Sequence, residues 1–122
     1  MPSTEPSDEL QNDAIDECID ACAEAQKSCQ RCAIADIQSG DTLMDVCAAI
    51  NLDCADICAA TLNALARHSR HYGDFCAVCA HLCRACAAEC ARHPHHSHCL
   101  QCQRACERCA AACERHAGAR HP

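Results

Sequence analysis

The sequence predicts an all-α protein, an antiparallel up-down-up-down four-helix bundle whose core is lined with cysteine. Seventeen of the 122 residues are cysteine, and within each helical segment they recur at steps of three, four or seven residues, the spacing of a heptad a/d seam. Alanine is the most frequent residue, and with Glu, Gln, Lys and Arg it favours helix throughout. Three short polar breaks divide the chain into four helix-length segments, and strand signals are lacking.

Residues 1–10 are expected to form a flexible acidic tail before a single bundle domain over residues 11–119. The N-terminus lacks the basic and apolar regions of a signal peptide, and no apolar run approaches the ~20 residues of a membrane span. We therefore expect a cytoplasmic protein without membrane contact. In a reducing cytosol, abundant cysteine indicates metal or redox chemistry and not structural disulfides.

The first predicted helix spans residues 10–37 and ends before the turn signal Ser39-Gly40-Asp41. Ala25 fills the one gap in its seam, whose cysteines are Cys18, Cys22, Cys29 and Cys32.

The second predicted helix spans residues 42–69. Its seam combines three cysteines with four other residues: Cys47, Cys54 and Cys58, and Met44, Asn51, Thr61 and Leu65. A second apolar stripe, at steps of seven, consists of Leu43, Ile50 and Ile57. This stripe has two interpretations, packing on a neighbouring helix of the same bundle or contact with another subunit.

The third and fourth predicted helices span residues 75–92 and 98–117. Asp74 and Ser97 are the expected N-caps, and Pro94 interrupts the helix between them. Each helix has five cysteines in 3-4-3-4 steps: Cys76, Cys79, Cys83, Cys86 and Cys90 in the third, and Cys99, Cys102, Cys106, Cys109 and Cys113 in the fourth. Connections this short make consecutive helices antiparallel neighbours.

The seam places every cysteine where a bundle has its core, and soft thiolates select Cu(I), Zn(II) or iron–sulfur clusters. Four tetrahedral zinc sites of four thiolates each would leave about −8 of charge in the core, which is costly. Monovalent Cu(I) with bridging thiolates gives a nearly neutral core. Aromatic residues make up only 2% of the chain, so bound metal is also an obvious further source of stability.

Other classes of function fit the sequence less well. A net charge of −7 and the absence of a basic stripe argue against nucleic acid. The near-equivalent thiols offer no singled-out nucleophile with a base, so we expect no enzyme. An odd number of cysteines and strained intrahelical geometry disfavour disulfides. The alternative that stays open is a zinc or general soft-metal thiol buffer or detoxification protein.

Four histidines cluster in the predicted turn between the third and fourth helices: His93, His95, His96 and His98. In an antiparallel bundle this turn lies near Met44 and three acidic residues, Asp36, Asp41 and Asp45. The cluster is interpreted either as a site where metal is loaded through exchangeable ligands or as a solvated polar turn. His93 and His98, which flank Cys90 and Cys99, are the strongest ligand candidates. The histidines of the opposite end, His68, His71 and His116, are expected at the surface.

Three motifs resemble those of the bacterial copper storage proteins: Asn51-Leu52-Asp53-Cys54-Ala55-Asp56-Ile57-Cys58, Glu89-Cys90-x-x-His93, and His98-Cys99-x-x-Cys102-x-x-x-Cys106-x-x-Cys109-x-x-x-Cys113. The similarity extends over residues 15–117. It implies a cytosolic four-helix bundle that holds many Cu(I) ions per chain and assembles as a homotetramer. It further implies that the seam cysteines are core ligands, Asn51 an oxygen ligand in the core, and His93 and His98 ligands near the open end. The chain departs from the family in having Met44 as the lone methionine ligand there, in an end richer in histidine. The copper donor and acceptor are not identified by the sequence.

Overall fold

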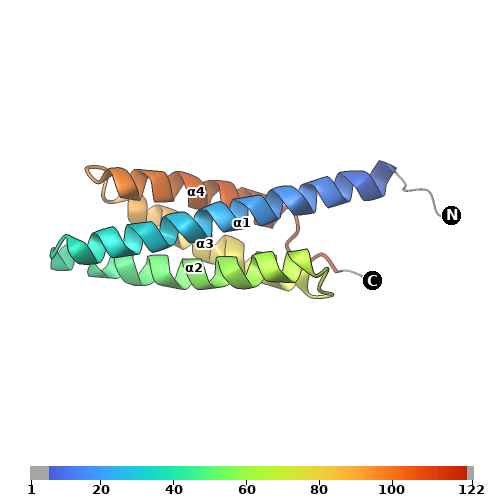
Figure 1. The fold of residues 1–122 in the computed structure, drawn as a ribbon, viewed down its shortest axis with the longest axis horizontal. Helices are drawn as coiled ribbons and strands as arrows, with labels where there is room; N and C mark the ends of the chain where they lie inside the picture. The colour runs from blue at the N-terminus through green and yellow to red at the C-terminus, as the bar shows by residue number, and fades with distance from the viewer. Residues whose placement is uncertain (1–5, 121–122) are drawn as a thin grey trace.

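The computed structural model describes residues 6–120 and confirms the predicted four-helix bundle. The helices are α1 (Pro6–Gln38), α2 (Asp45–Ala66), α3 (Tyr72–Ala91) and α4 (Ser97–Glu114), and a short 3-10 helix η1 (Thr42–Met44) precedes α2. Figure 1 shows them side by side along one long axis, alternating in direction. Contacts join α1 to α2, α2 to α3, α3 to α4 and α4 to α1, so the four helices form a closed ring around the core. No helix in the described part of the chain has the length and hydropathy of a membrane span.

The start of α1 differs from the prediction. The helix begins at Pro6, so residues 6–10 of the expected tail are helical, while residues 1–5 of that tail lie outside the described residues. Neither Gly nor Pro occurs between Ser7 and Ser39, and nothing in this stretch opposes extension of the helix toward the N-terminus. Consequently the N-terminal part of α1 projects beyond the other three helices (Figure 1).

The other helix ends also deviate from the predicted positions by a few residues. Asp41 caps η1 by accepting a hydrogen bond from the Leu43 amide at 2.9 Å. Asp74 and Ser97 are not N-caps: Asp74 lies in the first turn of α3, and Ser97 is the first residue of α4. The acidic Asp74 still favours the start of α3, because negative charge complements the helix dipole there.

Small residues fill most of the core. All seventeen cysteines are at most 1% exposed, and Ala21, Ala25 and Ala110 are fully buried among them. The four non-cysteine seam residues of the second predicted helix are buried as expected: Met44, Asn51, Thr61 and Leu65. The core is therefore a column of sulfur atoms with few bulky aliphatic side chains.

One end of the bundle is closed by residues that follow α4. The Gly118 amide donates to the Gly73 carbonyl at 3.2 Å, which holds the C-terminal turn against the first turn of α3. A Cβ atom at Gly73 would overlap the backbone of Ala119. The close approach of these two segments therefore requires glycine at this position.

Candidate metal centre

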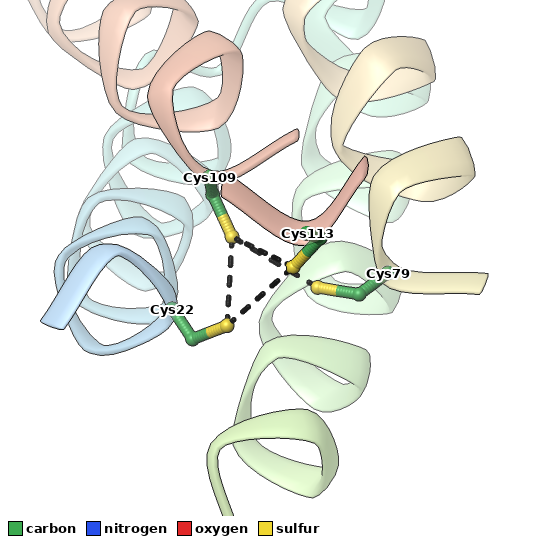
Figure 2. Close-up of side chains that lie close together, drawn as sticks. All are labelled: Cys22, Cys79, Cys109 and Cys113. Carbon is green, nitrogen blue, oxygen red and sulfur yellow. Dashed lines mark hydrogen bonds between the residues drawn. The ribbon is translucent and has the colours of Figure 1, made fainter. Parts of the chain in front are cut away.

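The sulfur atoms of the core come from all four helices and lie close to one another. In Figure 2, Cys22 of α1, Cys79 of α3, and Cys109 and Cys113 of α4 point toward a common centre. The Cys109 sulfur lies 3.7 Å from that of Cys22 and 3.9 Å from that of Cys79, and the Cys22 and Cys113 sulfurs are 3.9 Å apart. With a metal–sulfur distance of about 2.3 Å, two sulfurs on one ion lie at most about 4.6 Å apart. These thiols are therefore within reach of a shared soft metal ion.

Groups of this kind overlap along the core. At least three groups are composed of four thiols each, with all ligand atoms within 4.8 Å of one another: Cys22, Cys79, Cys109 and Cys113; Cys58, Cys79, Cys83 and Cys109; and Cys29, Cys86, Cys102 and Cys106. Cys79 and Cys109 belong to two of them, and Cys113 also joins Cys18 and Cys76 in a group of three. Ligands shared in this way suit bridging thiolates and do not divide into separate four-ligand sites.

Asn51 is the polar centre of the thiol column and is fully buried. The thiols of Cys86 and Cys102 donate to its Oδ1 at 3.1 and 3.0 Å. Its amide nitrogen lies 3.4 Å from the Cys47 sulfur and 3.5 Å from Asp36 Oδ2. The side chain thus presents an oxygen to the thiols on one side and links them to a carboxylate on the other.

A mixed group of donors lies at the histidine end of the bundle, which we define by residues 32–44 and 89–99. Asp36 is only 1% exposed. Its Oδ1 lies 2.9 Å from His98 Nε2. Cys32 and Cys99 complete a group whose four ligand atoms lie within 4.8 Å of one another. Burial raises the pKa of the Asp36 carboxyl, and the hydrogen bond from His98 opposes this effect.

His93 lies apart from His98, in a separate cavity of about 460 Å³ at the same end. Met44 and His96 also line this cavity, and His93 Nε2 lies 3.1 Å from Oε1 of the buried Glu89. The structure thus places the two predicted histidine ligands in two different surroundings, one beside core thiols and one beside Met44. His95 is exposed.

Without metal, burial favours the neutral thiol of Cys99 at the histidine end of the core. Desolvation raises the pKa of Cys99 to about 12, and the neighbouring Cys47 adds to this shift. A metal ion reverses the preference because a coordinated thiol is deprotonated. The donor set of buried sulfur, with one amide oxygen and imidazole at one end, fits a soft monovalent ion better than a hard cation.

A sequence profile described as copper storage protein (Csp) matches residues 11–118. The chain belongs to the copper storage protein family. Its similarity to solved members extends over most of the fold. A cytosolic copper storage protein from Streptomyces lividans with five coppers superposes with a TM-score of 0.81 at 33% identity, covering 88% of this chain and 94% of that one.

Two further relatives agree with this assignment. The Cu(I)-bound copper storage protein BsCsp3 superposes with a TM-score of 0.81 at 34% identity, covering 86% of this chain and 99% of that one. The uncharacterized cysteine-rich protein YhjQ of Bacillus subtilis (strain 168) is 36% identical over 74 residues, which is 60% of this chain and 68% of YhjQ.

In this member of the copper storage protein family, two acidic residues of the histidine end have closer histidine partners than the sequence analysis foresaw. Asp36 was expected near the end only in general, yet it follows Cys32 by four residues and so occupies the next seam position. Glu89 was not considered as a site residue, although it precedes His93 by four residues, the spacing of neighbours on one helix face. Continuing the heptad pattern of the first helix past its last cysteine predicts the buried position of Asp36. Pairing residues four apart on one helix face predicts the contact between Glu89 and His93.

One expectation for the opposite end was wrong. His116, predicted at the surface, is only 8% exposed because the C-terminal turn folds back over the bundle. Its ring lies 6.0 Å from that of Tyr72. Hydrogen bonding to Cys113 is the main influence that lowers the pKa of Cys18, and the charge of His116 contributes to the same shift.

Proposed function

We propose that this chain stores copper, binding many Cu(I) ions through the cysteine thiolates that line its four-helix core. The observation that carries the proposal is the overlap of the thiol groups, in which Cys79, Cys109 and Cys113 each belong to two. Shared thiolates let one chain hold far more ions than a single structural or sensing site needs. Membership of the family and the similarity to the Cu(I)-bound BsCsp3 support the same function.

The proposed ligands are the seventeen seam cysteines, Asn51 through its carbonyl oxygen, and His93, His98 and Met44 at the histidine end. Copper loading through that end is supported by the mixed donors there, because imidazole, thioether and carboxylate exchange more readily than buried bridging thiolates. The core charge supports Cu(I) over Zn(II), since one monovalent ion per thiolate leaves the core nearly neutral.

The remaining parts of the proposal concern assembly and location. A cytoplasmic, non-enzymatic protein is supported by the cytosolic relative from Streptomyces lividans and by the near-equivalence of the buried thiols. A homotetramer is supported by apolar side chains around the α1–α2 connection that are between 52% and 78% exposed: Ile34, Ile37, Leu43 and Val46. Light scattering of the Leu43→Asp variant tests this, and an unchanged tetramer mass or a wild-type monomer would count against it.

An anaerobic titration of the reduced protein with Cu(I), against a competing chromophoric chelator and beside a Zn(II) titration, tests the function. We expect an endpoint near or above one Cu(I) per cysteine and weak zinc binding. An endpoint of a few ions, or preferred binding of about four Zn(II) per chain, would instead establish the zinc or thiol-buffer function.

A further inference from the structure

A groove of about 360 Å³ runs between α1 and α4 and leads to the mixed donor group of the histidine end. Two of its lining residues, Cys32 and His98, belong to that group. The Cys32 thiol contacts both the Asp36 carboxylate and the Cys99 sulfur at 3.9 Å. The groove therefore reaches the partly exposed His98 and adjoins the fully buried Cys32 from the side of the bundle, separately from the cavity that holds Met44 and His93.

Three arginines line this groove, Arg31 from α1 and Arg104 and Arg108 from α4. None of the three forms an ion pair within the part of the chain that the structure describes. The one acidic residue of the lining, Glu24, is paired with Lys27 at 2.9 Å. On a chain with a net charge of −7, the groove is thus a local concentration of positive charge. The attraction of Glu24 for Arg31 and Arg108 offsets it only in part.

We propose that this groove binds a small thiol bearing carboxylates, which exchanges Cu(I) with Cys32 and its neighbours. The inference rests on the proposed storage function and specifies the ligand from which the protein takes copper. Guanidinium groups recognise carboxylates, and soft Cu(I) is held by thiolates. The volume of the groove is that of a small-molecule site, which favours a small ligand over a folded protein donor.

The exchange involves no oxidation or reduction. Cu(I) leaves a donor thiolate and bonds to the sulfur of Cys32 and then of Cys99, each of which loses its proton. Every donor thiolate released takes up one proton, so that charge and atoms balance. The arginines do not touch the metal; they hold the carboxylates of the donor so that its sulfur lies beside Cys32.

The first test follows Cu(I) transfer to the full-length apo protein from its glutathione complex and from its complex with the uncharged thiol β-mercaptoethanol. The variant is Arg31→Gln/Arg104→Gln/Arg108→Gln, and a control with the same change in net charge is Arg67→Gln/Arg70→Gln/Arg120→Gln. All six side chains are exposed, so both proteins are expected to fold. We expect the groove variant to lower the transfer rate from the glutathione complex by roughly tenfold or more, with little effect in the control or with β-mercaptoethanol.

An equal loss in both variants, an equal loss with both donors, or no loss would overturn the proposal.

The second test does not depend on copper. S-methylglutathione, which lacks a free thiol, is titrated into the reduced apo protein, and the NMR signals of the protein's backbone amides are followed. We expect shifts concentrated at the groove faces of α1 and α4, absent from the groove variant and retained in the control; no such shifts at millimolar ligand would also overturn it. Failure of the storage function itself would appear separately, in the endpoint of the Cu(I) titration.

Discussion

At the scale of single residues, the core depends on a few side chains that are neither cysteine nor alanine. Asn51 is the clearest case, because its oxygen accepts from Cys86 and Cys102 while its nitrogen faces Cys47 and Asp36. The Asn51 side chain fills about the volume that a leucine would fill, and it also supplies the hydrogen-bond partners that the surrounding buried polar groups require.

Replacing Asn51 by leucine keeps a similar volume and removes these partners. We expect the apo protein to lose about 1–3 kcal/mol of unfolding free energy, because the buried Asp36 loses a donor and two thiols lose an acceptor. Anaerobic denaturant unfolding measures this. Thr61→Val is the control, since Thr61 makes one longer hydrogen bond, to the Phe75 carbonyl at 3.4 Å, and we expect it to cost less. A stability of Asn51→Leu at or above that of the control would contradict this account.

Gly73 permits a second prediction at this scale. Its replacement by alanine is expected to displace the C-terminal turn, because the new Cβ overlaps the backbone of Ala119, with a cost of about 1–3 kcal/mol. Hydrogen exchange of the Gly118 amide should then accelerate, because the displaced turn loses the hydrogen bond from this amide to the Gly73 carbonyl. At Gly40 a Cβ meets no atom within 4 Å but the φ of +69° disfavours other residues, so Gly40→Ala should cost about 1 kcal/mol without altering exchange at Gly118. Unchanged exchange in Gly73→Ala would contradict the proposed closure.

At the scale of elements, each helix contributes one row of thiols, and the rows of α3 and α4 are the densest. Because their members belong to overlapping groups, no single helix holds a complete site. Metal capacity should therefore be distributed over the bundle.

Cysteine-to-serine changes in α3 or α4 test this distribution. We expect Cys79→Ser/Cys109→Ser to lower the Cu(I) endpoint roughly in proportion to the thiols removed, with a somewhat larger effect because each removed sulfur belongs to two groups. The matched control is Cys47→Ser/Cys90→Ser, which removes as many thiols from the other end of the core. Loss of all Cu(I) binding in either variant would show that copper is held at one discrete site.

The periodicity of the sequence was sufficient to predict these rows, because a/d spacing fixes which side chains a bundle buries. The ends of the elements were less predictable. Asp74 was expected as a cap but lies inside α3, since local side-chain preferences tolerate shifts of a residue or two. In the apolar stripe of the second predicted helix, Ile50 and Ile57 pack against the core of the same bundle, whereas Leu43 is 78% exposed.

At the scale of the whole molecule, the apo core consists of groups that ionise, an unusual property for a protein interior. Sequence could predict that the thiols are buried, but not their pKa values, which depend on distances between helices. The burial of His116 was likewise unpredictable, because it results from the C-terminal turn that folds back onto α3.

The raised pKa of Cys99 predicts how the apo protein responds to pH. Its folded value of about 12 exceeds the ordinary value of 9.0, so between these values the folded state binds more protons than the unfolded state. The associated stability is fully present below pH 9.0 and is lost as the pH rises toward 12. We expect anaerobic denaturant midpoints to fall over this range in wild type and to fall less in Cys99→Ala. A midpoint that rises with pH would contradict the assignment.

The near absence of bulky apolar side chains from the core has a consequence for the life of the protein in a cell. The same sulfur atoms pack the core and bind the metal. A ligand that binds only the native state also stabilises it, so loss of the metal lowers the free energy of unfolding. A depleted bundle opens more often and is cleaved sooner by proteases than a full one. The number of surviving copies would then follow the supply of the ion, without a separate sensor.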